Sequence, residues 1–111
     1  MKIKPVTWLG DSREQVKSFP AEPRGEIGFE LWEVQQGKEP SDFKPMPSIG
    51  LGVNEIRVRT ENAYRLIYVA RFAEAVYVLH AFEKKSRKTS KPDLELARNR
   101  YRQLIRERRQ R

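Results

Sequence analysis

Basic side chains recur at every second position in short stretches of this sequence. Arg57 and Arg59 are two residues apart, and Arg65 follows inside a mostly apolar run. His80 and Lys84 lie in a third stretch, at even spacing from each other. Guanidinium groups suit bidentate contacts with phosphate, and a histidine can exchange a proton near neutral pH. The pattern indicates either a phosphate-binding surface or the solvated face of ordinary strands.

For each of these residues the sequence leaves two alternatives, a structural role or a role in a functional site. Alternating charge, as at Arg57 and Arg59, is typical of any half-exposed strand. An unpaired charge is costly in an apolar strand, so we expect Arg65 to be ion-paired or part of a site. His80 is the only histidine. A lone histidine in an apolar strand is commonly a hydrogen-bonded packing residue, and a site residue is the equal alternative here.

Side chains of a strand alternate between its two faces, which shows which candidates can meet. Arg57 and Arg59 share one face of their strand, and Arg65 points away from its neighbours Tyr64 and Leu66. In the third stretch His80 shares a face with Phe82 and Lys84. Whether the three sets converge depends on the register of the strands, which the sequence leaves open.

The net charge of +8 is unevenly distributed. Residues 1–82 contain 11 basic and 11 acidic residues, whereas residues 83–111 contain 12 basic and 4 acidic ones. A block of this kind indicates a binding surface for a polyanion, or the solvated face of a helix.

Composition excludes several classes of protein. The absence of cysteine excludes disulfide scaffolds, thiolate zinc sites and cysteine nucleophiles. With a single histidine we expect no metal site and no cofactor, and Gly50-Leu51-Gly52 is too short for a phosphate loop. No apolar run could span a bilayer and no signal peptide is visible, so we expect a soluble, cytoplasmic protein. The length predicts one domain, residues 1–111.

Hydrophobic periodicity predicts the first elements. A strand is expected over residues 3–9, and Asp11 or Ser12 is expected to cap a short helix. A second helix is predicted from Glu22 to about Gln36, with Phe29 and Trp32 widening its apolar side. Three core positions at helical spacing define that side: Ile27, Leu31 and Val34. Gly37 is placed to end this helix, and the prolines of residues 38–48 predict a loop.

The period then changes to two. Strands are predicted around Ile56 and Val58, over residues 64–69 and over residues 75–82, joined by turns short enough to require an antiparallel meander. Ser90 with Asp93 predicts a capped C-terminal helix. Its apolar stripe consists of Leu94, Ala97, Tyr101, Leu104 and Ile105. We therefore predict an α+β fold with one N-terminal strand, two helices, a three-stranded meander and a basic C-terminal helix.

Residues 54–104 resemble the RelE/ParE toxin superfamily, and within it the HigB-like, often phage-derived branch. Three segments carry the resemblance: EIRVR, YRLIYV and VLHAFEKKSRKTSKPDLELAR. The resemblance implies a single sheet in which the N-terminal strand joins the meander. It also implies a toxin held in check by an antitoxin, usually a helix-turn-helix protein, and typically acting by cutting mRNA on the ribosome.

Cleaving RNA without a metal requires proton transfer and stabilisation of phosphorane charge, which clustered cations can supply. The resemblance therefore implies a catalytic set consisting of Arg65, His80, Arg57 and Lys84. An RNA-binding set would comprise Arg59, Phe82, Lys85, Lys88, Arg102, Arg106 and Arg109, with Thr89 extending the patch. Phe82 would stack on a base, and the last three arginines would contact ribosomal RNA.

Two other functions remain open. ParE toxins use the same fold to inhibit DNA gyrase without cleaving RNA, and fold alone does not separate the two activities. A phage-derived accessory protein that binds nucleic acid is the third alternative. The cationic set favours the nuclease, whose expected partners are a cognate antitoxin, mRNA and the ribosome, with no membrane and no small-molecule cofactor.

Overall fold

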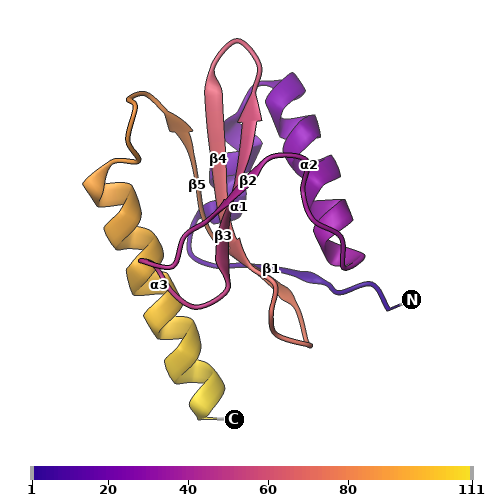
Figure 1. Ribbon diagram of the computed structural model, residues 1–111, viewed down its shortest axis with the longest axis vertical. Coiled ribbons are helices and arrows are strands. Elements are labelled where there is room, and N and C mark those ends of the chain that lie inside the picture. The colour runs from indigo at the N-terminus through magenta and orange to yellow at the C-terminus, as the bar shows by residue number, and fades with distance from the viewer. Residues whose placement is uncertain (1, 111) are drawn as a thin grey trace.

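The computed structural model describes residues 2–110 as one five-stranded sheet with helices on both faces (Figure 1). The elements in chain order are β1 (Val6–Trp8), α1 (Ser12–Ser18), α2 (Ala21–Gln35), β2 (Phe43–Pro45), β3 (Val53–Arg59), β4 (Ala63–Val69), β5 (Val76–Lys84) and α3 (Lys91–Arg109). The strand order is β1-β5-β4-β3-β2, with β1 parallel to β5 and the other neighbours antiparallel. The predicted α+β fold is confirmed, including the N-terminal strand in the same sheet as the meander.

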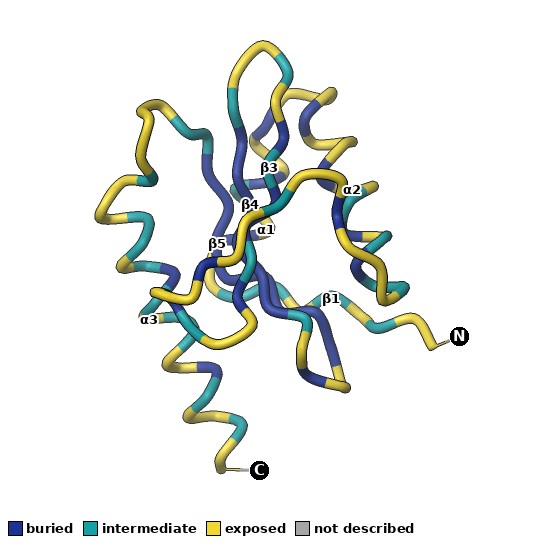
Figure 2. The backbone as a smooth tube through the Cα atoms, viewed as in Figure 1, coloured by how far each residue is buried: buried dark blue, intermediate teal, exposed yellow. Residues whose placement is uncertain are grey.

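Two apolar cores lie on opposite faces of this sheet. Helices α1 and α2 cover one face, where Ile27 and Leu31 pack with Leu66. Helix α3 covers the other, where Ala97 and Leu104 pack with Ile67. The central strands β4 and β5 are buried along most of their length, whereas the loops and outer helix faces are exposed (Figure 2).

Two details of the predicted elements are wrong. The proline-rich stretch 38–48 is not entirely loop, because it contains β2, which pairs with β3 at the edge of the sheet. An edge strand tolerates Pro45, since one side of it needs no hydrogen-bond donor. Phe29 and Trp32 do not widen the core face of α2, since they are 57% and 46% exposed. Phe29 lies two residues after Ile27, which turns it about 200° around the helix.

The helix ends are largely as predicted. Gly37 adopts φ +85°, and backbone bonds from Gly37 and Lys38 back to Val34 and Glu33 close α2. Ser90 caps α3 by accepting a bond of 3.2 Å from the Asp93 amide. Asp11 precedes α1 without a side-chain capping bond.

A bulge in β5 shifts the register between β4 and β5 beside His80. Ile67 pairs with His80, but the next residue, Tyr68, pairs with Val78, so that Leu79 is an extra residue in β5. Such a bulge lets two consecutive side chains turn to one face. Leu79 packs in the core beneath α3, and His80 reaches Asp93 of α3.

Within residues 2–110, none of the helices has both the length and the apolar character that a membrane span requires.

Candidate nucleic-acid interface

The register of the meander brings the candidate residues to one face of the sheet. Arg57 of β3 pairs with Arg65 of β4, and Arg65 in turn pairs with Phe82 of β5. Two residues nearer the strand ends, and on the same face, Arg59 pairs with Ala63, which pairs with Lys84. The strand register therefore answers the question that the sequence left open, because the three sets do converge.

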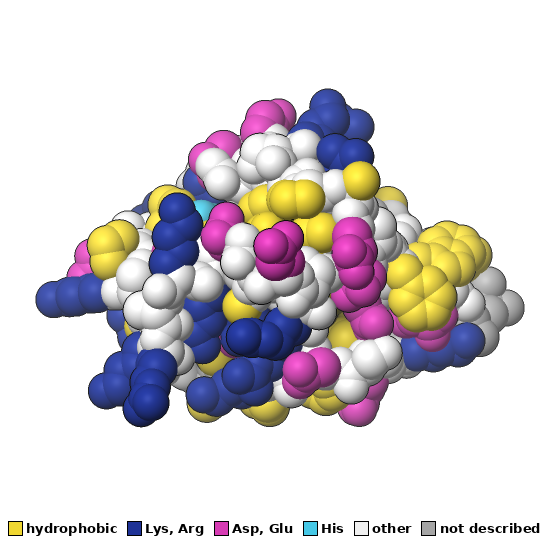
Figure 3. Space-filling view, turned by 90° about the horizontal axis from the view of Figure 1, so that it is seen from above, with side chains coloured by type: hydrophobic (Ala, Val, Ile, Leu, Met, Phe, Trp, Pro, Cys, Tyr) yellow, Lys and Arg dark blue, Asp and Glu magenta, His cyan; other side chains and the backbone are white. Residues whose placement is uncertain are grey.

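These residues surround a hollow at the end of the sheet. It has a volume of about 490 Å³ and is lined by Arg59, Ala63, Arg65, Lys84, Lys85, Ser86 and Arg87. We call it the cationic hollow. Its lining residues come from the strand ends next to the β3–β4 hairpin and from the segment that leads from β5 to α3. Both segments are at the top of Figure 1. Figure 3 views the molecule from this end and shows Lys and Arg side chains gathered at the lower left.

A second hollow of about 240 Å³ adjoins the first and shares Arg59 and Arg65 with it. Asp42, Arg57 and Val58 also line it. The four cations Arg57, Arg59, Arg65 and Lys84 thus line two adjoining hollows. Within the described residues 2–110, no group of three or more His, Asp or Glu side chains is placed to hold a metal ion.

Arg65 is both ion-paired and part of the hollow. The residue is only 7% exposed, and its Nε lies 3.4 Å from Oε1 of Glu55. Its Nη1 donates to the carbonyl of Tyr64 at 3.1 Å. Burial lowers the pKa of Arg65, the nearby Glu55 carboxylate opposes that shift, and Arg57 adds to it. The ion pair predicted as one alternative for Arg65 is present, and its part in a functional site stays a prediction.

Glu55 is the residue that sequence reasoning missed. It is 3% exposed, and its Oε2 accepts a bond of 3.3 Å from Thr89. Its position two residues before Arg57 places it on the same face of β3, so the same alternation could have identified it. Arg87, which lines the cationic hollow, was also missed, although it lies in the basic run KKSRK.

Lys84 lies in an environment that disfavours its own charge. Partial burial lowers the pKa of Lys84, and the neighbouring charges of Arg65 and Arg57 lower it further, against an opposing effect of Glu55. Cations that repel one another in this way are stabilised when an anion binds among them. Lys85 and Lys88 are exposed beside Lys84 on the same segment.

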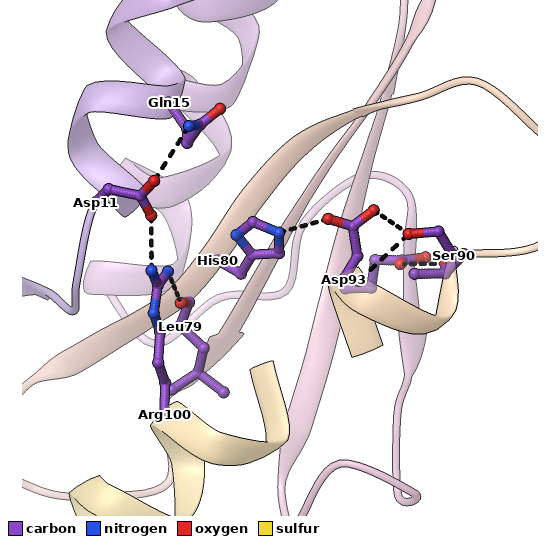
Figure 4. Close-up of polar contacts among 9 residues, drawn as sticks. Asp11, Gln15, Leu79, His80, Ser90, Asp93 and Arg100 are labelled. Carbon is purple, nitrogen blue, oxygen red and sulfur yellow. Dashed lines mark hydrogen bonds and ion pairs between the residues drawn. The ribbon is translucent and has the colours of Figure 1, made fainter. Parts of the chain in front are cut away.

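His80 and Phe82 lie behind this surface. They are 5% and 7% exposed, and their rings stack with centroids 5.2 Å apart. Nε2 of His80 is 2.7 Å from Oδ1 of Asp93, whose other oxygen accepts a bond of 2.6 Å from the Ser90 hydroxyl (Figure 4). Unlike Arg65, which is equally buried, neither residue lines the cationic hollow, so the geometry favours a supporting role for both over proton transfer and base stacking.

Residues 14–102 match the family described as Phage derived protein Gp49-like (DUF891). The chain belongs to this family. The Gp49-like family is a family of RelE-like toxins, which confirms that part of the resemblance and leaves the HigB-like branch a prediction. A search of curated proteins found no match.

The arginines of α3 in this Gp49-like protein fall into two groups. Arg98 donates to the carbonyl of Ser48. Arg100 binds Asp11 at 2.7 Å and the Leu79 carbonyl at 2.9 Å (Figure 4), and Arg108 binds Glu74 at 2.7 Å. These three hold α3 against the rest of the molecule. The predicted ribosome-contacting residues Arg102, Arg106 and Arg109 are exposed and line a separate, largely apolar groove of about 340 Å³ with Tyr101 and Ile105.

Proposed function

We propose that this Gp49-like protein is the toxin of a type II toxin–antitoxin pair. We further propose that it is a metal-independent, ribosome-dependent mRNA endonuclease of the HigB-like branch. The observation that carries the proposal is the cationic hollow with the smaller hollow beside it, where three strands bring together Arg57, Arg59, Arg65 and Lys84. Clustered guanidinium and ammonium groups of this kind are suited to holding a phosphate as negative charge develops on it.

In the proposed reaction the 2′-hydroxyl oxygen attacks the adjacent phosphorus and the bond to the 5′-oxygen breaks. The products are a 2′,3′-cyclic phosphate and a free 5′-hydroxyl. Arg65 and Arg57 stabilise the non-bridging oxygens in the transition state. Lys84 donates a proton to the leaving oxygen, for which its lowered pKa is suited, and the proton of the 2′-hydroxyl passes to water.

The remaining candidates have supporting roles in this proposal. Arg59, Lys85 and Lys88 contact the phosphates of flanking nucleotides, and His80 with Phe82 holds the end of β5 beneath the hollow. The three exposed arginines of α3 dock on ribosomal RNA through contacts that depend on charge and not on sequence. A cognate antitoxin, of helix-turn-helix type, restrains the toxin in the cytoplasm.

Controlled expression of the protein without its antitoxin tests the proposal. We expect growth arrest, with methionine incorporation falling before thymidine incorporation, and new 5′ ends in mRNA that primer extension can map. Arg65→Ala serves as the inactive control. Thymidine incorporation that stops first, with intact mRNA, would instead identify a gyrase inhibitor. Growth without arrest would favour the accessory protein.

A further inference from the structure

A buried carboxylate lies directly behind the cationic hollow. The two oxygens of Glu55 contact different elements, with Oε1 beside Arg65 of β4 and Oε2 accepting from Thr89 in the segment before α3. Glu55 itself belongs to β3. One side chain thus connects the three elements whose ends form the hollow.

We propose that Glu55 is a positioning residue, which orients Arg65 and the segment 85–89 for cleavage of RNA. This inference rests on the proposed nuclease function. Glu55 acts through Arg65, because Glu55 itself does not line the hollow. It lies two residues further from the strand end than Arg57 and pairs with Ile67, which pairs with His80.

Binding of RNA alone does not account for a carboxylate at this position. Glu55 contributes a negative charge where the site must attract a phosphate, and this weakens that attraction. A buried ion pair is also weak as a source of stability, since well-packed apolar residues of similar volume often do as well. Orientation of the guanidinium is the function that does require a carboxylate here.

The contacts show how this orientation arises. A guanidinium is planar and carries several N–H donors in fixed directions. The Glu55 carboxylate forms an ion pair at Nε without a directed hydrogen bond, and Nη1 donates to the Tyr64 carbonyl. Together these two contacts restrict the guanidinium, and the residue still lines the hollow. A group held in this way can meet the phosphorane without first losing rotational freedom.

The decisive variant is Glu55→Gln, which keeps the shape of the side chain and removes its charge. Binding to ribosomes programmed with a defined mRNA should tighten by about twofold at low salt, because a negative charge is lost. Single-turnover cleavage should slow by roughly tenfold or more, since small misplacements of a catalytic group have large effects on rate. A merely structural residue would not move binding and cleavage in opposite directions.

Glu61→Gln is the matched control, because Glu61 is exposed at the tip of the β3–β4 hairpin beside the same hollow. It removes the same charge without touching Arg65, so it should leave the cleavage rate unchanged. Thr89→Val, which removes the bond to Oε2 and leaves the ion pair, should slow cleavage by a few fold. This variant decides the matter if Glu55→Gln does not fold, as judged by circular dichroism.

The outcomes separate the two proposals. If the wild type cleaves mRNA and folded Glu55→Gln cleaves at the same rate, the positioning role is wrong and the nuclease stands. If Glu55→Gln unfolds and Thr89→Val cleaves like the wild type, the positioning role is also wrong. If the wild type does not cleave mRNA on programmed ribosomes, the nuclease function fails and the positioning role fails with it.

Discussion

The cationic hollow and helix α3 are both rich in basic residues, but they use them differently. On α3, Arg98, Arg100 and Arg108 contact carboxylates or carbonyls elsewhere in the chain. In the cationic hollow and the smaller hollow beside it, Arg57, Arg59 and Lys84 have no ion pair within residues 2–110, whereas Arg65 pairs with Glu55. Half of the arginines of α3 therefore hold the helix against the rest of the chain, whereas most cations of the two hollows have no carboxylate partner.

The difference shows that net charge along the chain is a poor guide to where unpaired cations gather in the fold. Residues 1–82 are neutral overall, yet they supply Arg57, Arg59 and Arg65. The excess charge of residues 83–111 is partly neutralised by contacts with Asp11 and Glu74, which lie far away in the sequence. The cations come close together because the ends of β3, β4 and β5 lie side by side in the sheet.

Substitution of Arg65 should have the largest effect. Arg65→Ala removes an interaction that the mechanism places in the transition state, worth about 2–4 kcal/mol, so cleavage should slow by roughly a hundredfold or more. Ribosome binding should survive. Arg65→Lys is the second variant, because alanine also leaves Glu55 buried without a partner, whereas lysine retains the charge and loses the fork geometry. Near wild-type cleavage by a folded Arg65→Lys would show that the catalytic centre lies elsewhere.

Substitution of Arg100 should affect stability and not chemistry. Arg100→Ala removes a charged hydrogen bond to Asp11 and another to the Leu79 carbonyl. We expect the free energy of unfolding to fall by about 1–3 kcal/mol in urea titrations. The matched control is Arg102→Ala on the exposed side of the same helix, which should change it by no more than about 0.5 kcal/mol. Equal effects of the two would remove the distinction between the two groups of arginines.

The exposed arginines of α3 should affect the salt dependence of ribosome binding. Each phosphate contact contributes roughly −0.7 to −0.9 to the slope of log K against log salt. Replacing Arg102, Arg106 and Arg109 with Gln should therefore flatten that slope by about 2 to 3, with little change in single-turnover cleavage at saturating protein. An unchanged slope would mean that these side chains only face solvent.

The smallest effect concerns Glu74, which Arg108 and Tyr77 hydrogen-bond and whose pKa they lower to about 2. A carboxyl whose pKa is lower in the folded state contributes stability above its ordinary pKa of 4.5, and that stability is lost as pH falls toward about 2. Glu74→Gln should lower the Tm slightly at pH 7. The difference from the wild type should narrow between pH 4.5 and 2, and a constant difference would contradict this origin.

Much of the fold was predictable because its signals are local. Gly37 and the Ser90–Asp93 cap end or begin helices through contacts within a few residues. The edge strand β2 was missed because it pairs with residues of β3 that are nine or more positions away, and because its prolines predict a loop. The buried state of His80 was equally invisible, since Asp93 covers it from another element.

The amino-acid sequence by itself determined the strand and helix periods, the parity of Arg57, Arg59, Arg65 and Lys84 within their strands, and the likeness to RelE-like toxins. Only the tertiary structure decided which of these residues meet, because strand register and the bulge at Leu79 set the alignment of three separate segments. It also decided which charges are neutralised. Glu55 lies beside Arg65, and Asp11 beside Arg100, through packing of elements that are distant in the chain.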